Sequence, residues 1–185
     1  MIQALVTIVM GSASDWPVMQ GAADMLQQFQ IAYDVTVSSA HRAPQRTAQL
    51  ARQAAARGVQ VIIAGAGGAA HLAGVIAAET TLPVIGVPID APPLHGLDAL
   101  LATVQMPRGV PVATVAVGRS GAANAGILAA QIIALGAPEV AARLRQFKAE
   151  LAMRVERDAE ALQAQLPQHG TRPHGREGEA TLSDR

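Results

Sequence analysis

The chain has 185 residues, of which 50% are hydrophobic and 15% are charged, which suits one domain with a sizeable core. Its 14 basic residues balance its 14 acidic residues, so the sequence lacks the basic excess that is typical of nucleic-acid binding. The absence of cysteine excludes disulfides, a thiol nucleophile and a cysteine-based zinc site. No basic leader precedes the first apolar run, and no run reaches the roughly 18 residues of a membrane span. We therefore expect a cytoplasmic protein without membrane contact.

Short apolar runs alternate with alanine-rich helical runs through the first three quarters of the chain. These runs predict strands over residues 4–10, 32–37, 59–64, 84–87 and 112–117, and helices over residues 17–29, 44–57, 69–79, 97–104 and 121–135. Most strands are apolar nearly throughout, which is typical of a parallel sheet covered on both faces. The alternation predicts a single doubly wound α/β domain, a flavodoxin-like three-layer αβα sandwich with right-handed crossovers.

A long final helix is predicted over residues 138–163. Its apolar side chains recur at helical spacing, as at Leu144, Phe147 and Leu151, before the sequence becomes strongly charged. We expect the domain to span residues 1–165 with this C-terminal helix included. Residues 166–185 are polar, and we expect a disordered tail there. Composition favours a solvated tail over a metal site at its two histidines, His169 and His174.

The loop GSASDWP at residues 11–17 follows the first predicted strand. Ser14 or Asp15 is suited to cap the next helix, and Pro17 suits its first turn. Capping does not explain why two serines, an aspartate and a tryptophan share one turn. A cradle for phosphate or ribose hydroxyls is the other interpretation, and the residues alone leave both open.

The loop SAHRAP at residues 39–44 follows the second predicted strand. His41 can move protons near neutral pH, and Arg42 can hold a phosphate or carboxylate through two parallel hydrogen bonds. Pro44 favours a helix start, where backbone N–H groups attract anions. This loop therefore combines an acid–base group with an anion clamp.

The loop GAGGAAHL at residues 65–72 follows the third predicted strand. Its glycines expose backbone N–H groups, while His71 is either a site residue or a structural histidine at a helix start. Gly65, Gly67 and Ala70 also match the G-x-G-x-x-A dinucleotide fingerprint, with Asp90 about 20 residues further on. That fingerprint normally lies on the first strand–helix turn, whereas this match lies on the third. The chain has no GxxxxGK[ST] loop, so we do not expect ATP hydrolysis.

All three loops follow strands and therefore lie at the carboxyl edge of the predicted sheet. In the common strand order 2-1-3-4-5, these strands are neighbours, and their loops share the crevice where open α/β sheets bind ligands. This convergence is stronger evidence for a site than any single loop.

With these motifs in hand, the chain resembles the class I N5-carboxyaminoimidazole ribonucleotide (N5-CAIR) mutases of purine biosynthesis. The resemblance covers about residues 4–135 in register. The sequence departs from the family pattern at Ala43, at Ala73 and in the proline-rich segment 91–96. Its motifs are MGSASDW at 10–16, SAHRAP at 39–44, VIIAGAGGAAHL at 61–72, LPVIGVP at 82–88, VQMPRGVPVAT at 104–114 and GAANAGILAAQI at 121–132.

The resemblance implies that a carboxyl group moves from N5 to C4 of a nucleotide through loss and recapture of CO2 in a closed site. His41 is then the catalytic proton shuttle, and neither metal nor organic cofactor is needed. The resemblance also implies an upstream ATP-dependent carboxyaminoimidazole ribonucleotide synthetase and a homo-octamer. The substrate-binding residues it implies are Gly11, Ser12, Ser14, Asp15, Ser39, Ala40, Arg42, Gly67, Gly68, Ala69, His71 and Leu72.

Two other classes of function compete with this expectation. One is a nucleotide-binding module without catalysis, for which His41 beside Arg42 has no need. The other is an NAD-dependent oxidoreductase, which the glycine fingerprint alone suggests. A content of only 2% aromatic residues independently favours subunit contacts that complete a core of small side chains.

Overall fold

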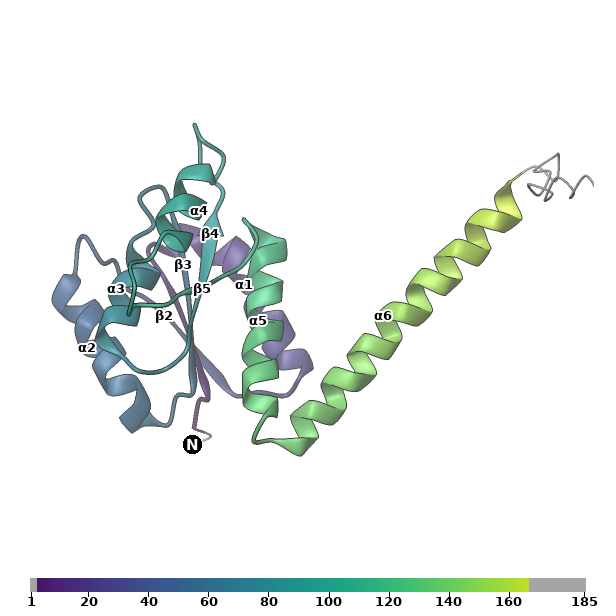
Figure 1. The fold of residues 1–185 in the computed structure, drawn as a ribbon, viewed down its shortest axis with the longest axis horizontal. Helices are drawn as coiled ribbons and strands as arrows, with labels where there is room; N and C mark the ends of the chain where they lie inside the picture. The colour runs from purple at the N-terminus through teal and green to yellow at the C-terminus, as the bar shows by residue number, and fades with distance from the viewer. Residues whose placement is uncertain (1–2, 167–185) are drawn as a thin grey trace, which may run out of the picture. The chain divides into compact units, whose positions relative to one another are not determined.

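Five parallel strands alternate with helices in the computed structural model, which describes residues 3–166 (Figure 1). The sheet order is β2-β1-β3-β4-β5, which confirms the predicted doubly wound α/β fold with its long C-terminal helix. The strands are β1 (Val6–Met10), β2 (Tyr33–Val37), β3 (Val61–Gly67), β4 (Val84–Ile89) and β5 (Ala113–Thr114). The helices are α1 (Trp16–Gln28), α2 (Pro44–Ala54), α3 (Leu72–Glu79), α4 (Leu97–Val104), α5 (Arg119–Ala134) and α6 (Pro138–Gln165), with 3-10 turns η1 (Ala13–Asp15) and η2 (Ala55–Arg57).

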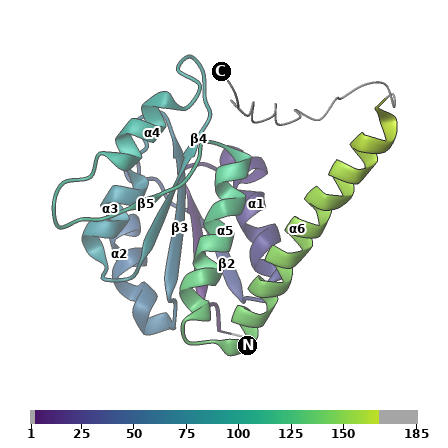
Figure 2. The same cartoon turned by 45° about the vertical axis from the view of Figure 1, so that its right-hand side comes forward.

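Helices α1 and α5 cover one face of the sheet, while α2 and α3 cover the other (Figure 2). Successive strand residues point to opposite faces, so Ile8 and Ile63 join the core under α1 and α5, whereas Val9 and Ile62 join the core under α2 and α3. Burial on both faces explains why these strands are apolar throughout.

Several predicted boundaries differ from the structure, among them three that differ by three residues. Strand β3 runs on to Gly67 because Ala66 and Gly67 pair with Pro88 and Ile89 of β4. Helix α3 begins only at Leu72, because Ala70 before it has a positive φ of 34° that no right-handed helix contains. The fifth strand covers two residues rather than the predicted 112–117, since its pairing with β4 ends at Thr114.

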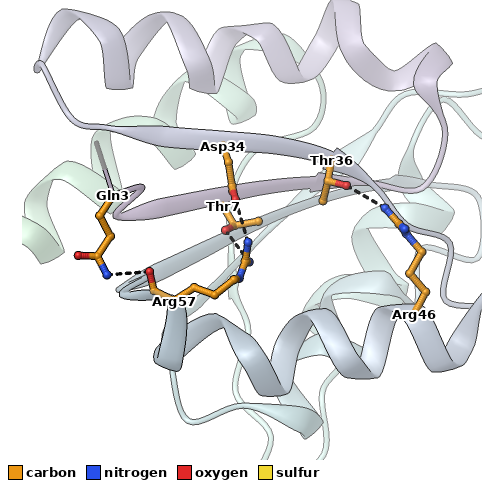
Figure 3. A network of polar contacts seen from close by, with 6 residues as sticks. All are labelled: Gln3, Thr7, Asp34, Thr36, Arg46 and Arg57. Atoms are coloured by element: carbon orange, nitrogen blue, oxygen red, sulfur yellow. Dashed lines mark hydrogen bonds and ion pairs between the residues drawn. The ribbon is translucent and has the colours of Figure 1, made fainter. Parts of the chain in front are cut away.

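Two arginines tie the edge strand β2 to the helical layer that follows it (Figure 3). Arg57 of η2 donates to Asp34 Oδ2 at 3.1 Å and to Thr7 Oγ1 at 3.5 Å. Arg46 of α2 donates through Nε to the Val37 carbonyl oxygen at 3.3 Å and through Nη2 to Thr36. The last residue of β2 is thus fixed immediately before the histidine-containing loop.

The chain divides into two units, Met1–Phe147 and Lys148–Arg185, with the boundary inside α6. In the first unit, Val140 and Leu144 are buried, and the ring of Phe147 packs edge-on against Phe29 with centroids 5.4 Å apart. In the second unit, apolar side chains of α6 such as Val155 are exposed. The single domain over residues 1–165 stays a prediction, and nearly all of the expected tail lies outside the described residues. Within the described part of the chain, no helix has the length and apolar character to span a membrane.

Candidate active site

The loop after β1 folds into the 3-10 turn η1. Ser12 is its N-cap: the Ser12 hydroxyl accepts from Ser14 N at 3.3 Å, and Ser12 N donates to Asp15 Oδ2 at 3.0 Å. The Ser14 hydroxyl also donates to Ser12 Oγ at 2.8 Å. These bonds form a capping box for η1, and they hold the Asp15 carboxylate at the carboxyl end of β1. The predicted side-chain cap on the helix that follows is not formed, because Asp15 stands at the N-cap of α1 without a side-chain hydrogen bond to it.

The loop after β2 is held by a hydrogen bond to α2 and by hydrogen bonds between its own residues. The buried Ser38 shares a 2.8 Å hydroxyl–hydroxyl bond with Thr47 of α2. Ser39 Oγ accepts from the backbone N of Arg42 at 3.2 Å and from its Nε at 3.3 Å. Arg42 Nη2 donates to the Gly11 carbonyl oxygen at 2.9 Å, so this side chain joins the first loop to the second.

The loop after β3 reaches the second loop through a pair of histidines. Gly68 and Ala70 both have positive φ, 61° and 34°, and this reversal leads into His71, the N-cap residue of α3. His41 Nε2 and His71 Nδ1 lie 2.7 Å apart in a hydrogen bond, with the rings nearly perpendicular at 85°. Both side chains are exposed on the wall of the same pocket.

Residues of all three loops line one pocket of about 380 Å³ at the carboxyl edge of the sheet. The strand order places β1 between β2 and β3, as the prediction of a shared crevice requires. The lining residues are Gly11, Ser12, Asp15, Ser39, Ala40, His41, Arg42, Ala66, Gly67, Ala70, His71 and Leu72.

Burial in this pocket raises the pKa of the Asp15 carboxyl above its ordinary value of 3.8. The hydrogen bond from Ser12 N, the positive charge of Arg42 and the Ser14 hydroxyl act in the opposite direction and only partly offset the loss of solvent. Asp15 and Arg42 therefore form a polar patch that can meet both hydroxyl groups and anionic groups of a ligand.

Three residues predicted to contact substrate lie beside the pocket lining rather than in it. Ser14 is exposed and bonds to Ser12, while Gly68 and Ala69 form the turn after β3. A role for these three in ligand contact stays a prediction. Sequence reasoning missed Ala66 and Ala70, whose only signal is their place within the glycine-rich motif.

The dinucleotide fingerprint is not formed as a turn. Gly65 and Gly67 lie inside β3, where Gly65 pairs with Met10 of β1 and Val87 of β4. A Cβ on Gly65 would collide with the Met19 side chain, so glycine at this position allows α1 to pack closely on β3. Among residues 3–166, no group of three or more histidine, aspartate or glutamate side chains is placed to hold a metal ion.

Comparisons with known proteins show the family to which this chain belongs. An N5-carboxyaminoimidazole ribonucleotide mutase from Vibrio cholerae is 57% identical over 145 residues, which cover 78% of this chain and 90% of that protein. A protein of the same name from Pyrococcus horikoshii is 52% identical over 159 residues, 86% of this chain and 89% of its own length. The crystal structure of Treponema denticola PurE superposes with a TM-score of 0.79 at 27% identity, covering 86% of this chain and 98% of that chain. The model of the AIR carboxylase family matches residues 5–154, and the chain belongs to that family.

Proposed function

We propose that this chain is an N5-CAIR mutase of purine biosynthesis, which converts N5-CAIR into 4-carboxy-5-aminoimidazole ribonucleotide. The observation that carries the proposal is that His41, Arg42 and Asp15 line the same pocket. Relatives that are 57% and 52% identical to this chain over 145 and 159 aligned residues bear that activity in their names. A nucleotide-binding module without catalysis needs the anion clamp but has no use for a histidine beside it.

The substrate is a nucleotide with a phosphate, ribose hydroxyls and a carbamate. Asp15 accepts hydrogen bonds from hydroxyl groups, and Ser12, Ser14 and Ser39 offer further hydroxyls to the sugar phosphate. Arg42 supplies positive charge, although its Nη2 is committed to Gly11, so the remaining N–H groups of its guanidinium serve the ligand. The backbones of Gly11, Ala40 and the segment 67–72 flank the base and its carboxylate.

His41 is the proton shuttle in this proposal. The charged imidazolium gives a proton to N5 as the N5–carboxyl bond breaks, which leaves aminoimidazole ribonucleotide, CO2 and neutral His41. Carbon C4 then attacks the CO2 carbon, and neutral His41 removes the C4 proton. The imidazolium is restored, so no proton, metal or organic cofactor is consumed.

The trapped CO2 must be recaptured before it diffuses away, so the proposal requires a pocket that closes over the substrate and excludes water. The substrate itself contains a labile carbamate, which an ATP-dependent carboxyaminoimidazole ribonucleotide synthetase upstream supplies in the cytoplasm. The reaction of this chain then consumes no nucleoside triphosphate, and the sequence contains no GxxxxGK[ST] loop to bind one.

We place the chain in a homo-oligomer, an octamer by its resemblance to the family. The support is an apolar row on α6 that begins in the core at Leu144 and continues to exposed side chains at Leu151, Val155 and Leu162. Helix α4 and the loop before it expose a second row with helical spacing: Leu94, Leu97, Leu101 and Val104. Copies of the same chain that cover these rows would bury them within closed symmetry.

A direct assay tests the activity: purified protein and N5-CAIR are mixed without ATP or bicarbonate, and formation of the C4 carboxylate is followed. We expect turnover by the wild type and a loss of at least about a hundredfold in His41→Asn, with nucleotide binding kept within about tenfold. Binding is followed by the fluorescence of Trp16, the single tryptophan. We expect aminoimidazole ribonucleotide to change this fluorescence and NAD to leave it unchanged. Near-normal turnover by folded His41→Asn would contradict the shuttle.

A further inference from the structure

The hydrogen bond between His41 and His71 restricts where the two rings can carry their protons. His41 Nε2 and His71 Nδ1 are 2.7 Å apart, which is a short distance for a bond between two ring nitrogens. A single proton fits between them, so one ring donates and the other accepts. Two imidazolium rings would present N–H to N–H, and the bond therefore forbids both histidines from being charged together.

The proton shuttle decides which ring donates. A charged His41 carries a proton on each nitrogen, so it is the donor at Nε2. His71 must then be neutral, with a bare Nδ1 and its own proton on Nε2. Nδ1 of His41 is the nitrogen that this bond leaves for the substrate. We propose that His71 is a positioning residue, which holds His41 in the state where the same nitrogen, Nδ1, gives a proton and takes it back; this inference rests on the proposed function.

The second half of the reaction depends on this bond. After Nδ1 has given its proton, neutral imidazole can carry the remaining proton on either nitrogen. The Nδ1 of His71 retains that proton on Nε2 of His41, which leaves a lone pair on His41 Nδ1, directed at the group it has just protonated. Without the acceptor, part of the enzyme would hold the other tautomer, whose Nδ1 is protonated and cannot remove the C4 proton.

The structure also supplies what fixes the acceptor. His71 is the N-cap residue of α3, and its carbonyl oxygen accepts from Val75 N at 2.9 Å. Buried Leu72, next in the chain, belongs to the core under α2 and α3. His41 is likewise exposed, in the loop between β2 and α2 that the bonds of Ser39 and Arg42 hold in place. Because both histidines stand on a fixed backbone, the bond between their rings determines how the exposed His41 ring is turned.

The test uses two substitutions at His71 and a matched one elsewhere. In His71→Asn, the amide oxygen can take the place of the Nδ1 acceptor, whereas His71→Leu removes it. We expect His71→Leu to lower kcat at least tenfold with KM changed less than threefold, and His71→Asn to recover most of kcat. His95→Leu is the control, since His95 is an exposed histidine outside the pocket lining. A His71→Leu enzyme with unchanged kcat, a rise in KM alone, or His71→Asn no better than His71→Leu would each overturn the assignment.

Nitrogen-15 NMR of the histidine rings in the substrate-free protein separates this inference from the proposed function. We expect neutral His41 in the wild type to carry its proton on Nε2, and both tautomers to appear in His71→Leu. The same spectrum in both proteins, or Nδ1-protonated His41 in the wild type, would contradict the inference whatever the enzyme's activity. A wild type that shows the Nε2–H tautomer and catalyses no carboxyl shift would instead contradict the proposed function.

Discussion

Arg42 links two loops and also carries the positive charge in the pocket. Its Nε and Nη2 already bond to Ser39 and Gly11, and only a planar guanidinium reaches both while it keeps N–H groups for an anion. We expect Arg42→Lys to raise KM for the nucleotide by about tenfold or more, because lysine keeps the charge and loses the fork. Steady-state kinetics measure the effect. Arg52→Lys, in a surface pair with Glu79, is the control that should leave KM unchanged; an unchanged KM in Arg42→Lys would argue against the clamp.

The raised pKa of the Asp15 carboxyl leads us to expect that the stability of the protein depends on pH. Burial raises the pKa of its carboxyl in the folded protein, so the folded state binds this proton more tightly than the unfolded state. The contribution of Asp15 to stability is therefore full below its ordinary pKa of 3.8 and is lost as the pH rises through the raised pKa. Asp15→Asn has no such proton.

The measurement for Asp15 is denaturant unfolding of the wild type and Asp15→Asn at several pH values on both sides of 3.8. We expect the stability of the wild type relative to the variant to fall as the pH rises through this range and to be level at higher pH. A relative stability that rises with pH would mean that the Ser12 and Arg42 contacts outweigh burial.

The residue types in the three loops predicted much of the pocket lining. The remaining features depend on the local backbone geometry, which the sequence does not show directly. His41 and Arg42 were identifiable because they combine an acid–base group with an anion clamp after a strand, at a sheet edge where two further loops were expected to meet them. The bond between His41 and His71 was not predictable, since it joins residues whose separation in space depends on the turn through Gly68 and Ala70. Ala66 and Ala70 carry no functional group that would have marked them.

The contact between α1 and α5 requires glycine at one position. A Cβ on Gly126 would lie 2.7 Å from the Ala22 carbonyl oxygen and 2.9 Å from Met25 Cβ, closer than atoms in real structures approach. We expect Gly126→Ala to lower the free energy of unfolding by about 1–2 kcal/mol, because overpacking outweighs the gain in helix propensity of about 1 kcal/mol.

Gly136→Ala provides the comparison for Gly126→Ala, since a Cβ at Gly136 meets no atom within 4 Å. Denaturant unfolding at equal protein concentration should place Gly136→Ala close to the wild type and Gly126→Ala clearly below it. Equal stability of the two variants would mean that α1 and α5 separate at no cost.

The hydrophobic pattern of the sequence predicts which segments form strands and helices, but it does not predict where each of them ends. The buried strands β1, β3 and β4 were predictable because continuous apolar runs suit a doubly covered sheet. The fifth strand was predicted too long, because Val115 and Val117 look equally strand-like in sequence while pairing stops at Thr114. Strand ends depend on which neighbour is available for hydrogen bonds, and a single segment does not contain that information.

The assembly of whole chains is testable by mass. Exposed apolar side chains on α6 and α4 lead us to expect a light-scattering mass near eight chains of 19.0 kDa at micromolar concentration. Val155→Glu should lower that mass, because the new charge would lie in a buried interface. Gln163→Glu adds the same charge at a polar exposed position of α6 and should not. A wild-type mass near 19.0 kDa would contradict the oligomer.

In the proposed reaction, one closed pocket moves a carboxyl group without releasing it. The direct test supplies N5-CAIR with carbon-13 in the N5 carboxylate, in buffer that contains excess unlabelled bicarbonate, and measures the label in the product by mass spectrometry. A parallel reaction with His41→Asn corrects for uncatalysed exchange. We expect the C4 carboxylate formed by the wild type to keep the label. A product that carries mostly unlabelled carboxylate would show capture of free CO2 and would contradict the proposed reaction.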